Sequence, residues 1–352
     1  MMEFKTITLR CDDRWDDMVR RSSDGTIYHL SVWASVLEAT IGGQILSVIA
    51  HERDGGPLVG GVPFMVETGL FGKRRMVPLP LTATCSPLIP ADQLAGALRH
   101  AMAEDPRVRS VKLKVLGTTT FTAPGMEVTS DAVCHHLNLS RSLDSIFHAL
   151  GNSSVRHRIS RADRNGARVR WTEDEAGVRE LFRLIRETRY RKGLPVLPYR
   201  FFANMWNFLR PLGLIDIPLL EMRGRIVAAA AVLKFGGRAH LEYSSCAQDF
   251  FRSGANQRLI WEAICNAHEA GARLFDFGRS SVSNASLIAF KDQWGTERVP
   301  ILQFVGPGSS RPANRLLSTA RPLIEMINRR MPRLLLSMAG HLLYRKQRQP
   351  SW

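Results

Sequence analysis

The chain has 352 residues, which is enough for two domains that each bury a core. Its 45% hydrophobic and 23% charged residues are typical of a folded globular protein and unlike a disordered one. Its five cysteines have no CxxC spacing, which argues against a disulfide framework or a zinc motif and fits a reducing compartment. No run reaches the roughly 18 apolar residues that a membrane-spanning helix needs, and the polar N-terminus predicts no signal peptide, so we expect a cytoplasmic protein.

The net charge of +16 is concentrated in two segments. Residues 151–170 contain six Arg and one Asp, and residues 311–352 contain nine Lys or Arg and one Glu. Together they hold 13 of the 16 net charges, so the rest of the chain is close to neutral. Charge this dense predicts a polyanionic partner, such as a phosphate group, nucleic acid or an anionic membrane face. A solubilising surface is the alternative.

Residues 1–141 predict a mixed α/β domain, because runs with period-two alternation suit strands and runs with helical apolar spacing suit helices. The expected strands are residues 4–9, 45–51, 59–67, 75–79, 108–115 and 132–139. The expected helices are residues 12–21, 32–40 and 91–103. Asp12 or Asp13 is the candidate N-cap of the first helix, and the turn-rich residues 53–57 predict a hairpin between the second and third strands.

Residues 142–306 predict a second mixed α/β domain with a similar order of elements. The expected helices are residues 142–167, 173–191, 199–209 and 253–269, and Gly151-Asn152 can break the first of them. The expected strands are residues 169–172, 214–222, 226–235, 239–245, 273–277 and 299–305. Residues 274–295 place a polar turn between a strand end and a helical run, where sites of α/β proteins tend to lie. A solvated turn is the alternative.

The remaining residues, 307–352, predict a linker and a tail. Gly306-Pro307-Gly308-Ser309-Ser310 has linker composition. Residues 311–352 alternate apolar residues with Arg in the manner of two basic amphipathic helices. Such a tail can make peripheral contact with an anionic membrane, on the inner face of the cytoplasmic membrane, or it can pack on the first domain.

Four motifs in the second domain, in this order and spacing, resemble one protein family. They are VRHRISRA at 155–162, TRYRKGLP at 188–195, FDFGRS at 275–280 and FKDQWG at 290–295. The first domain adds Trp33 and LVGGVPF at 58–64. With these motifs the chain resembles the FemAB-like branch of the Gcn5-related N-acetyltransferase (GNAT) superfamily, in particular the bacterial group associated with exosortase and exopolysaccharide systems.

The resemblance implies two tandem GNAT-like domains, with the active cleft mainly in the second, and transfer of an acyl or aminoacyl group to an amine. It implies no permanently bound cofactor, and acyl-CoA or aminoacyl-tRNA as a phosphate-bearing co-substrate. The acyl-CoA signature Arg/Gln-x-x-Gly-x-Gly/Ala has its nearest counterpart at residues 251–256, FRSGAN. We therefore expect an acyltransferase that modifies a cell-envelope or exopolysaccharide precursor. The alternatives are a tRNA-dependent peptidoglycan bridge ligase and a non-catalytic, membrane-peripheral scaffold.

The candidate catalytic residues are Lys291, Asp276 and Tyr243. In well-known family members a Phe-Lys pair, here Phe290-Lys291, lies at the substrate, and a fixed cation can stabilise an oxyanion. Asp276 can act as the base or orient the amine, or it can form a structural pair with Arg279. Tyr243 can protonate a leaving group, with a core tyrosine as the alternative.

Candidate binding residues fall into two groups, and no metal is expected, because His135 and His136 are adjacent and point to opposite faces of a strand. The candidate substrate-binding residues are Arg279, Ser280, Phe290, Trp294, Arg189 and Tyr190. The candidate donor- or phosphate-binding residues are Arg156, Arg158, Arg161, Arg252, Ser253, Gly254 and Asn256. The last three open a helix whose free N–H groups suit a phosphate. An ordinary helix cap and a solvated basic helix are the alternatives.

Overall fold

The computed structural model describes residues 2–11, 13–52, 56–68, 74–117, 125–150, 154–306 and 335–338. The chain divides into two compact units. Among the described residues, unit 1 comprises residues 2–133 and 299–306, and unit 2 comprises residues 134–298 and 335–338. The first division precedes the boundary expected after residue 141. The expected tail helices at 311–352, apart from 335–338, and the expected break at Gly151-Asn152 lie outside the described residues.

Unit 1 is a mixed sheet with helices packed on it. Its strands follow the order β1-β2-β3-β4-β5-β14, in which only the β4–β5 pair is parallel. They are β1 (Glu3–Thr8), β2 (Ile45–His51), β3 (Leu58–Thr68), β4 (Arg74–Val77), β5 (Val108–Leu116) and β14 (Glu297–Val305). The helical segments are η1 (Leu9–Cys11), α1 (Asp13–Arg21), η2 (Ile27–His29), α2 (Ser31–Ile41) and α3 (Ala91–Glu104).

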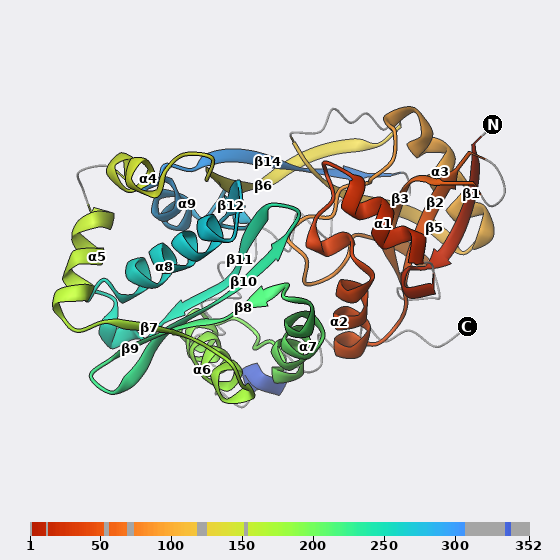
Figure 1. Ribbon diagram of the computed structural model, residues 1–352. Coiled ribbons are helices and arrows are strands. Elements are labelled where there is room, and N and C mark those ends of the chain that lie inside the picture. The colour runs from red at the N-terminus through yellow and green to blue at the C-terminus, as the bar shows by residue number, and fades with distance from the viewer. Residues whose placement is uncertain are drawn as a thin grey trace. The chain divides into compact units, whose positions relative to one another are not determined.

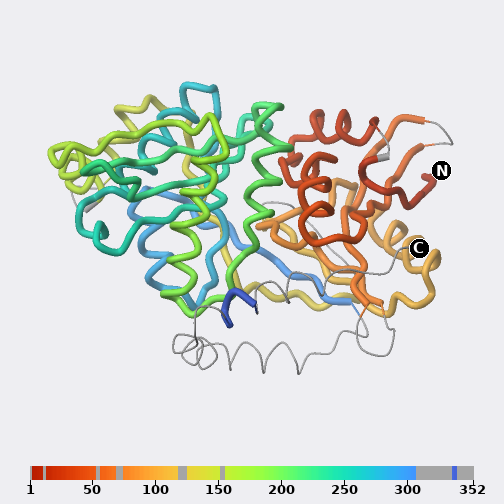
Figure 2. Tube along the Cα trace, turned by 90° about the horizontal axis from the view of Figure 1, so that it is seen from below, coloured from red at the N-terminus to blue at the C-terminus, as the bar shows by residue number. Residues whose placement is uncertain are grey.

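The last strand returns to the unit in which the chain began. Residues Ile301–Val305 of β14 pair with β5, and the blue trace of β14 runs back to the orange strands in Figure 2. Helix α3 makes the crossover between parallel strands β4 and β5, as a parallel connection requires. It buries Leu94, Ala97, Leu98 and Ala101 in the same core as Val111 and other strand residues.

The strands of unit 2 follow the mixed order β6-β12-β11-β10-β9-β7, which continues the same sheet. Its strands are β6 (Glu127–Asn138), which begins in unit 1, β7 (Arg168–Trp171), β8 (Ile215–Asp216), β9 (Pro218–Met222), β10 (Arg225–Phe235), β11 (Arg238–Cys246), β12 (Leu274–Asp276) and β13 (Ser280–Ser281). Its helical segments are α4 (Leu143–Ala149), α5 (Ser154–Arg164), α6 (Glu175–Arg191), α7 (Tyr199–Leu209), η4 (Arg210–Leu212), η5 (Gln248–Phe250), α8 (Ala255–Glu269) and α9 (Ala285–Asp292).

Helices cover both faces of this sheet. The consecutive residues Ser244 and Ser245 of β11 point to opposite faces, as strand geometry requires. Ser244 Oγ donates to Asn256 of α8 at 3.0 Å, whereas Ser245 Oγ donates to the Leu184 carbonyl of α6 at 2.9 Å. Figure 1 shows α8 on one side of β10 and β11, and α6 with α7 on the other. No helix in the described part of the chain is long and apolar enough to cross a membrane.

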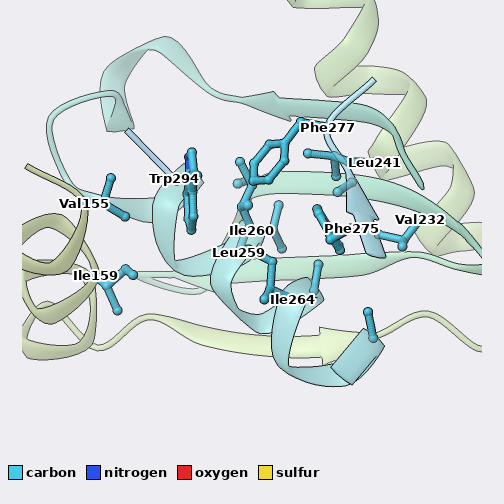
Figure 3. Close-up of a cluster of buried hydrophobic side chains, with 14 of the residues drawn as sticks. Val155, Ile159, Val232, Leu241, Leu259, Ile260, Ile264, Phe275, Phe277 and Trp294 are labelled. Atoms are coloured by element: carbon cyan, nitrogen blue, oxygen red, sulfur yellow. The ribbon is translucent and has the colours of Figure 1, made fainter. Parts of the chain in front are cut away.

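The face under α8 holds the main apolar core of unit 2. Phe275, Phe277 and Trp294 are each at most 3% exposed and lie with Leu259, Ile260 and Ile264 of α8 in Figure 3. The Phe277 and Trp294 ring centroids are 5.5 Å apart. Because Phe275 and Phe277 point into this core, Asp276 between them must point to the opposite face. Packing of the two phenylalanines in the core therefore directs the Asp276 side chain to the face opposite α8.

Two elements differ from their expected limits for clear physical reasons. Strand β6 starts at Glu127, five residues before the expected 132, and residues 127–131 are exposed, so no apolar pattern marks them. The expected strand 214–222 is divided into β8 and β9 before Pro218, a residue that has no N–H to donate to a ladder.

Candidate functional site

The parallel pairing of β11 and β12 covers only three residue pairs. They are Arg238 with Leu274, Ala239 with Phe275, and His240 with Asp276. Strand β12 then ends, while β11 continues to Cys246 against β10. The described strands therefore separate just beyond Asp276. In an open sheet with parallel strands, the ends of such strands are where ligands commonly bind.

A β-bulge lies on β11 at this point of separation. Ala231 of β10 pairs with Tyr243, and the next residue, Val232, pairs with Leu241, so Glu242 is the additional residue of β11. A bulge changes the direction of nearby side chains and is common beside active sites. Glu242 is half-buried and close enough to the Cys134 thiol to raise its pKa.

Asp276 is the buried carboxylate of the site, at 3% exposure. Its Oδ2 lies 3.1 Å from His240 Nδ1 and 3.7 Å from His136 Nε2, and its Oδ1 accepts the Gly278 N–H at 2.7 Å. Burial alone would raise the pKa of this carboxyl, but the two imidazoles outweigh it and hold the pKa far below its usual range. A carboxylate with so low a pKa is a poor proton acceptor. The geometry thus favours the orienting role for Asp276 over the base role.

Lys291 of α9 is buried beside this carboxylate, at 6% exposure. Its Nζ donates to the Gly278 carbonyl at 2.8 Å and to the Arg279 carbonyl at 3.4 Å. Burial lowers the pKa of Lys291 to about 8, although the charge of Asp276 acts in the opposite direction. Lys291 therefore fixes the turn that follows β12, and this turn carries the exposed Arg279.

Strand β6 brings two further side chains to the same face. His136 is the register partner of Asp276, and Cys134 precedes it by two residues, so both share one face of the strand. Cys134 is fully buried, and burial is the main cause that raises its pKa well above the usual value. The charges of Asp276 and Glu242 raise it further, while Lys291 and Arg279 oppose them. We refer to Cys134, His136, His240, Glu242, Asp276, Arg279 and Lys291 as the polar cluster.

Sequence reasoning missed Cys134, His136, His240 and Glu242. They lie 34 to 142 residues before Asp276 in the chain, and only the strand register and the bulge reveal that they are neighbours. The alternation of His136 with Cys134 was the one visible signal. The adjacent His135 points to the opposite face of the strand, as expected for neighbouring residues. Its Nε2 lies 3.7 Å from Asp292 Oδ1.

The other predicted substrate-binding residues mostly support the fold around the cluster. Trp294 and Ser280 are 0% and 1% exposed, and Phe290 packs on the core, so these side chains offer a substrate little surface. Arg189 Nε donates to the Pro195 carbonyl at 2.5 Å. Tyr190 is half-buried near the end of α6.

Tyr243 agrees best with its alternative interpretation as a packing tyrosine. Its ring lies 6.0 Å from Phe201 and 5.2 Å from Phe202, edge to face. Both phenylalanines belong to α7, so the ring ties β11 to that helix. The half-buried tyrosine therefore has a structural use that needs no part in proton transfer.

The predicted phosphate-binding residues meet where α5 approaches the start of α8. Gly254 has φ +88°, and a Cβ there would lie 1.9 Å from the Arg158 carbonyl oxygen. Arg161 Nη1 donates to the Arg252 carbonyl at 3.1 Å, and the side chains of Arg158, Arg161 and Arg252 are exposed. Arg156 is half-buried. The geometry therefore gives a tight helix junction with exposed guanidinium groups around it.

Two residues at the start of α8 have partners within the protein. Ser253 Oγ accepts the Ala255 N–H at 3.1 Å, which is ordinary capping. Asn256 Oδ1 accepts the Ser244 hydroxyl at 3.0 Å. Both side chains are thus used in holding the helix in place.

Comparison with known proteins identifies this region. Residues 153–291 match the family model described as an acetyltransferase (GNAT) domain. These residues therefore resemble a GNAT acyltransferase domain. Most of the polar cluster lies within this match, whereas Cys134 and His136 precede it. No curated protein matches the sequence.

The fold is similar to those of several solved structures. FemX matches with a TM-score of 0.68 at 14% identity, over 90% of this chain and 99% of that chain. L-PGS from Bacillus licheniformis matches with 0.59 at 13%, over 87% and 95%. A tandem GNAT protein from the clavulanic acid biosynthesis pathway matches with 0.53 at 14%, over 88% and 100%. The expected FemAB-like GNAT resemblance and the mixed α/β fold of tandem GNAT-like domains are confirmed.

Proposed function

We propose that this protein transfers an acyl or aminoacyl group from an activated carrier to an amine on a cell-envelope or exopolysaccharide precursor. The polar cluster at the end of β12 is the observation that supports this most strongly. It places a half-buried acid, an exposed guanidinium and a buried ammonium beside diverging strands, within the residues that match the GNAT domain. Acyl transfer needs a base and a positioned substrate, and this cluster can supply both.

Glu242 is the proposed general base. The acceptor nitrogen attacks the carrier's carbonyl carbon, and the C–N bond forms as the bond to the carrier's sulfur or oxygen breaks. Glu242 takes the proton that the nitrogen loses, and the carrier leaves as a thiol or hydroxyl after taking up a proton from solvent water. Asp276, fixed by His240, and Lys291, fixed on the Gly278 carbonyl, position the turn that carries Arg279. Arg279 suits a carboxylate or phosphate of the substrate.

The carrier proposed is acyl-CoA or aminoacyl-tRNA, since both contain phosphates. The exposed Arg158, Arg161 and Arg252 at the α5–α8 junction suit such a group. The basic residues 311–352 are proposed as a peripheral contact with an anionic membrane, which would bring the enzyme to lipid-linked precursors.

The experiment that tests the function compares two carriers on full-length protein. A thermal-shift series with acetyl-CoA and longer acyl-CoAs should raise Tm if acyl-CoA is the donor, and charged tRNA should support aminoacyl transfer in the alternative that the protein is a bridge ligase. If neither carrier binds at saturating concentration, both proposals are overturned. Lys291→Ala and Asp276→Ala should abolish transfer. If a cellular function survives both substitutions, the non-catalytic scaffold is the better explanation.

A further inference from the structure

Three side chains with metal-binding atoms lie together in the polar cluster. The ligand atoms of Cys134, His136 and Asp276 are all within 4.8 Å of one another. Cys134 and His136 come from β6, and Asp276 comes from the adjacent strand β12. The arrangement follows from the sheet itself, because His136 and Asp276 are register partners and Cys134 shares their face.

These separations are close to those of a coordination sphere. Tetrahedral bonds of about 2.0–2.3 Å place ligand atoms roughly 3.4–3.8 Å apart. Asp276 Oδ2 and His136 Nε2 are 3.7 Å apart, within this range. Rotation of the Cys134 side chain is the main adjustment that binding would need, and no backbone movement is required to bring the two strands together.

A second layer of contacts already orients the carboxylate. His240 Nδ1 lies 3.1 Å from Asp276 Oδ2, and the Gly278 N–H donates to Oδ1 at 2.7 Å. Metal sites depend on such outer contacts to fix their ligands. They are present here on a carboxylate that is only 3% exposed.

The burial of Cys134 favours a metal ligand over a nucleophile. The side chain has no exposed surface, so a bulky acyl donor has no direct access to its sulfur. A small ion needs only the route past His136, whose side chain is 12% exposed. A bound cation would also stabilise a thiolate that is otherwise costly in this environment.

We propose that Cys134, His136 and Asp276 bind a divalent transition-metal ion of the zinc type, with the fourth coordination position filled by water. A thiolate, an imidazole and a carboxylate together suit zinc or cobalt and do not suit magnesium or calcium. The ion would join β6 to β12 at the end of β12 and thereby stabilise this part of unit 2. The proposal does not depend on the reaction assigned above.

Lys291 is the charge that opposes this site. Its ammonium interacts electrostatically with both Cys134 and Asp276, and it remains on the Gly278 carbonyl at 2.8 Å. A second cation nearby weakens binding of a positive ion. Removing Lys291 should therefore raise the affinity for the metal, whereas substitution of a ligand should lower it. These opposite expected changes in affinity make the test specific.

The test uses full-length protein stripped with a chelator and titrated with Co²⁺, followed by Zn²⁺ competition. We expect one equivalent per chain, a thiolate-to-cobalt absorption band, and a higher Tm with Zn²⁺. Cys134→Ser should remove the band, while the matched control Cys246→Ser, another buried cysteine of unit 2, should keep it. His136→Gln should weaken binding by about 100-fold or more, and His240→Gln by about 10–100-fold. Lys291→Met should tighten it.

Three outcomes overturn the proposal. They are no saturable binding, a cobalt spectrum that is unchanged in Cys134→Ser, and an acyl adduct on Cys134 detected by intact mass after incubation with acyl-CoA. The last outcome would make Cys134 a nucleophile. If Cys134→Ser fails to fold, His136→Gln is the decisive variant, because the His136 side chain is 12% exposed and its replacement disturbs the core less. This variant must lose metal binding while its circular dichroism spectrum stays unchanged. Acyl transfer that continues without metal leaves the proposed reaction intact.

Discussion

In the described part of each unit, a parallel strand pair is joined through a helix, and these two pairs differ in chemistry. Segments β4–α3–β5 of unit 1 and β11–α8–β12 of unit 2 each show three parallel residue pairs. Helix α3 follows Pro90, whereas α8 follows Gly254 at φ +88°. Strand β5 continues to Leu116 and buries Leu113 and Val115, whereas β12 stops at Asp276. The same topology is thus used for packing in one unit and surrounds the candidate site in the other.

The two units also hold buried carboxylates of opposite kinds. Asp105 of unit 1 accepts from Arg74 at 2.7 Å and from Arg107 at 3.1 Å. Asp276 of unit 2 is contacted by two imidazoles. Guanidinium groups keep their protons at all relevant pH values, whereas imidazoles can exchange protons or bind metal. The comparison predicts that changes around Asp105 affect stability alone and that changes around Asp276 affect chemistry.

The largest expected effect is on the reaction itself. Glu242→Gln removes the proposed base at nearly constant volume and should lower kcat by about 100- to 10,000-fold. The matched control is Glu221→Gln, a half-buried glutamate on β9 outside the polar cluster, which should leave kcat unchanged. Steady-state kinetics with the carrier found by thermal shift provide the measurement. Equal activity of the Glu242 and Glu221 variants would remove Glu242 from the mechanism.

In unit 1, removal of the cation should affect stability without affecting activity. Arg74→Met leaves Asp105 buried beside only one guanidinium, and both partners of the broken pair are 10% exposed. We expect a loss of about 3–5 kcal/mol in the free energy of unfolding, measured by urea titration, with kcat unchanged below the melting transition. A fall in kcat as large as that of Glu242→Gln would contradict the prediction that the Asp105 ion pair affects stability alone.

The same ion pair makes unit 1 sensitive to acid. Burial would raise the pKa of Asp105, but the hydrogen bonds from Arg74 and Arg107 outweigh it and lower the pKa below the usual 3.8. A carboxyl whose pKa is lowered on folding stabilises the protein above its unfolded pKa, and this contribution is lost as pH falls through the folded value. Arg74→Met should therefore show a weaker loss of stability than the wild type when the pH is lowered below about 4.

The helix junction of unit 2 allows steric and conformational costs to be separated. Gly254→Ala places a Cβ 1.9 Å from the Arg158 carbonyl oxygen and also retains the unfavourable φ of +88°. Gly271→Ala has a similar φ of +80° with nothing within 4 Å of its Cβ. We expect losses of about 3–4 kcal/mol and about 1 kcal/mol in the free energy of unfolding. Equal losses in chemical denaturation would show that the approach of α5 to α8 imposes no steric requirement.

The fold was more predictable from the sequence than the site. Apolar periodicity marked α6 and α7 nearly to their ends, because each has a buried and an exposed side. Strand β10 was instead marked by a continuous apolar run, which is buried from Val227 to Leu233. The family motifs directed attention to Asp276, Arg279 and Lys291, which do lie in one cluster. The bulge at Glu242 and the register of His136 with Asp276 leave no local signal, since both depend on which strands become neighbours. Burial of Trp294 was equally invisible, because a conspicuous aromatic residue suits a core as well as a binding surface.

The last expected effect concerns the buried ammonium of Lys291, for which unit 1 has no counterpart among its described buried residues. Its pKa falls to about 8 on folding from the usual 10.5, mainly through burial. Below pH 8 both states hold the proton and the burial cost is fully present. Between pH 8 and 10.5 the folded state has lost the proton while the unfolded state retains it, so stability rises with pH by at most about 3 kcal/mol. Lys291→Met lacks this rise, and urea titrations of both proteins at pH 7 and pH 10 measure the difference. Parallel changes in the two proteins would mean that Lys291 keeps its ordinary pKa and is not desolvated in the polar cluster.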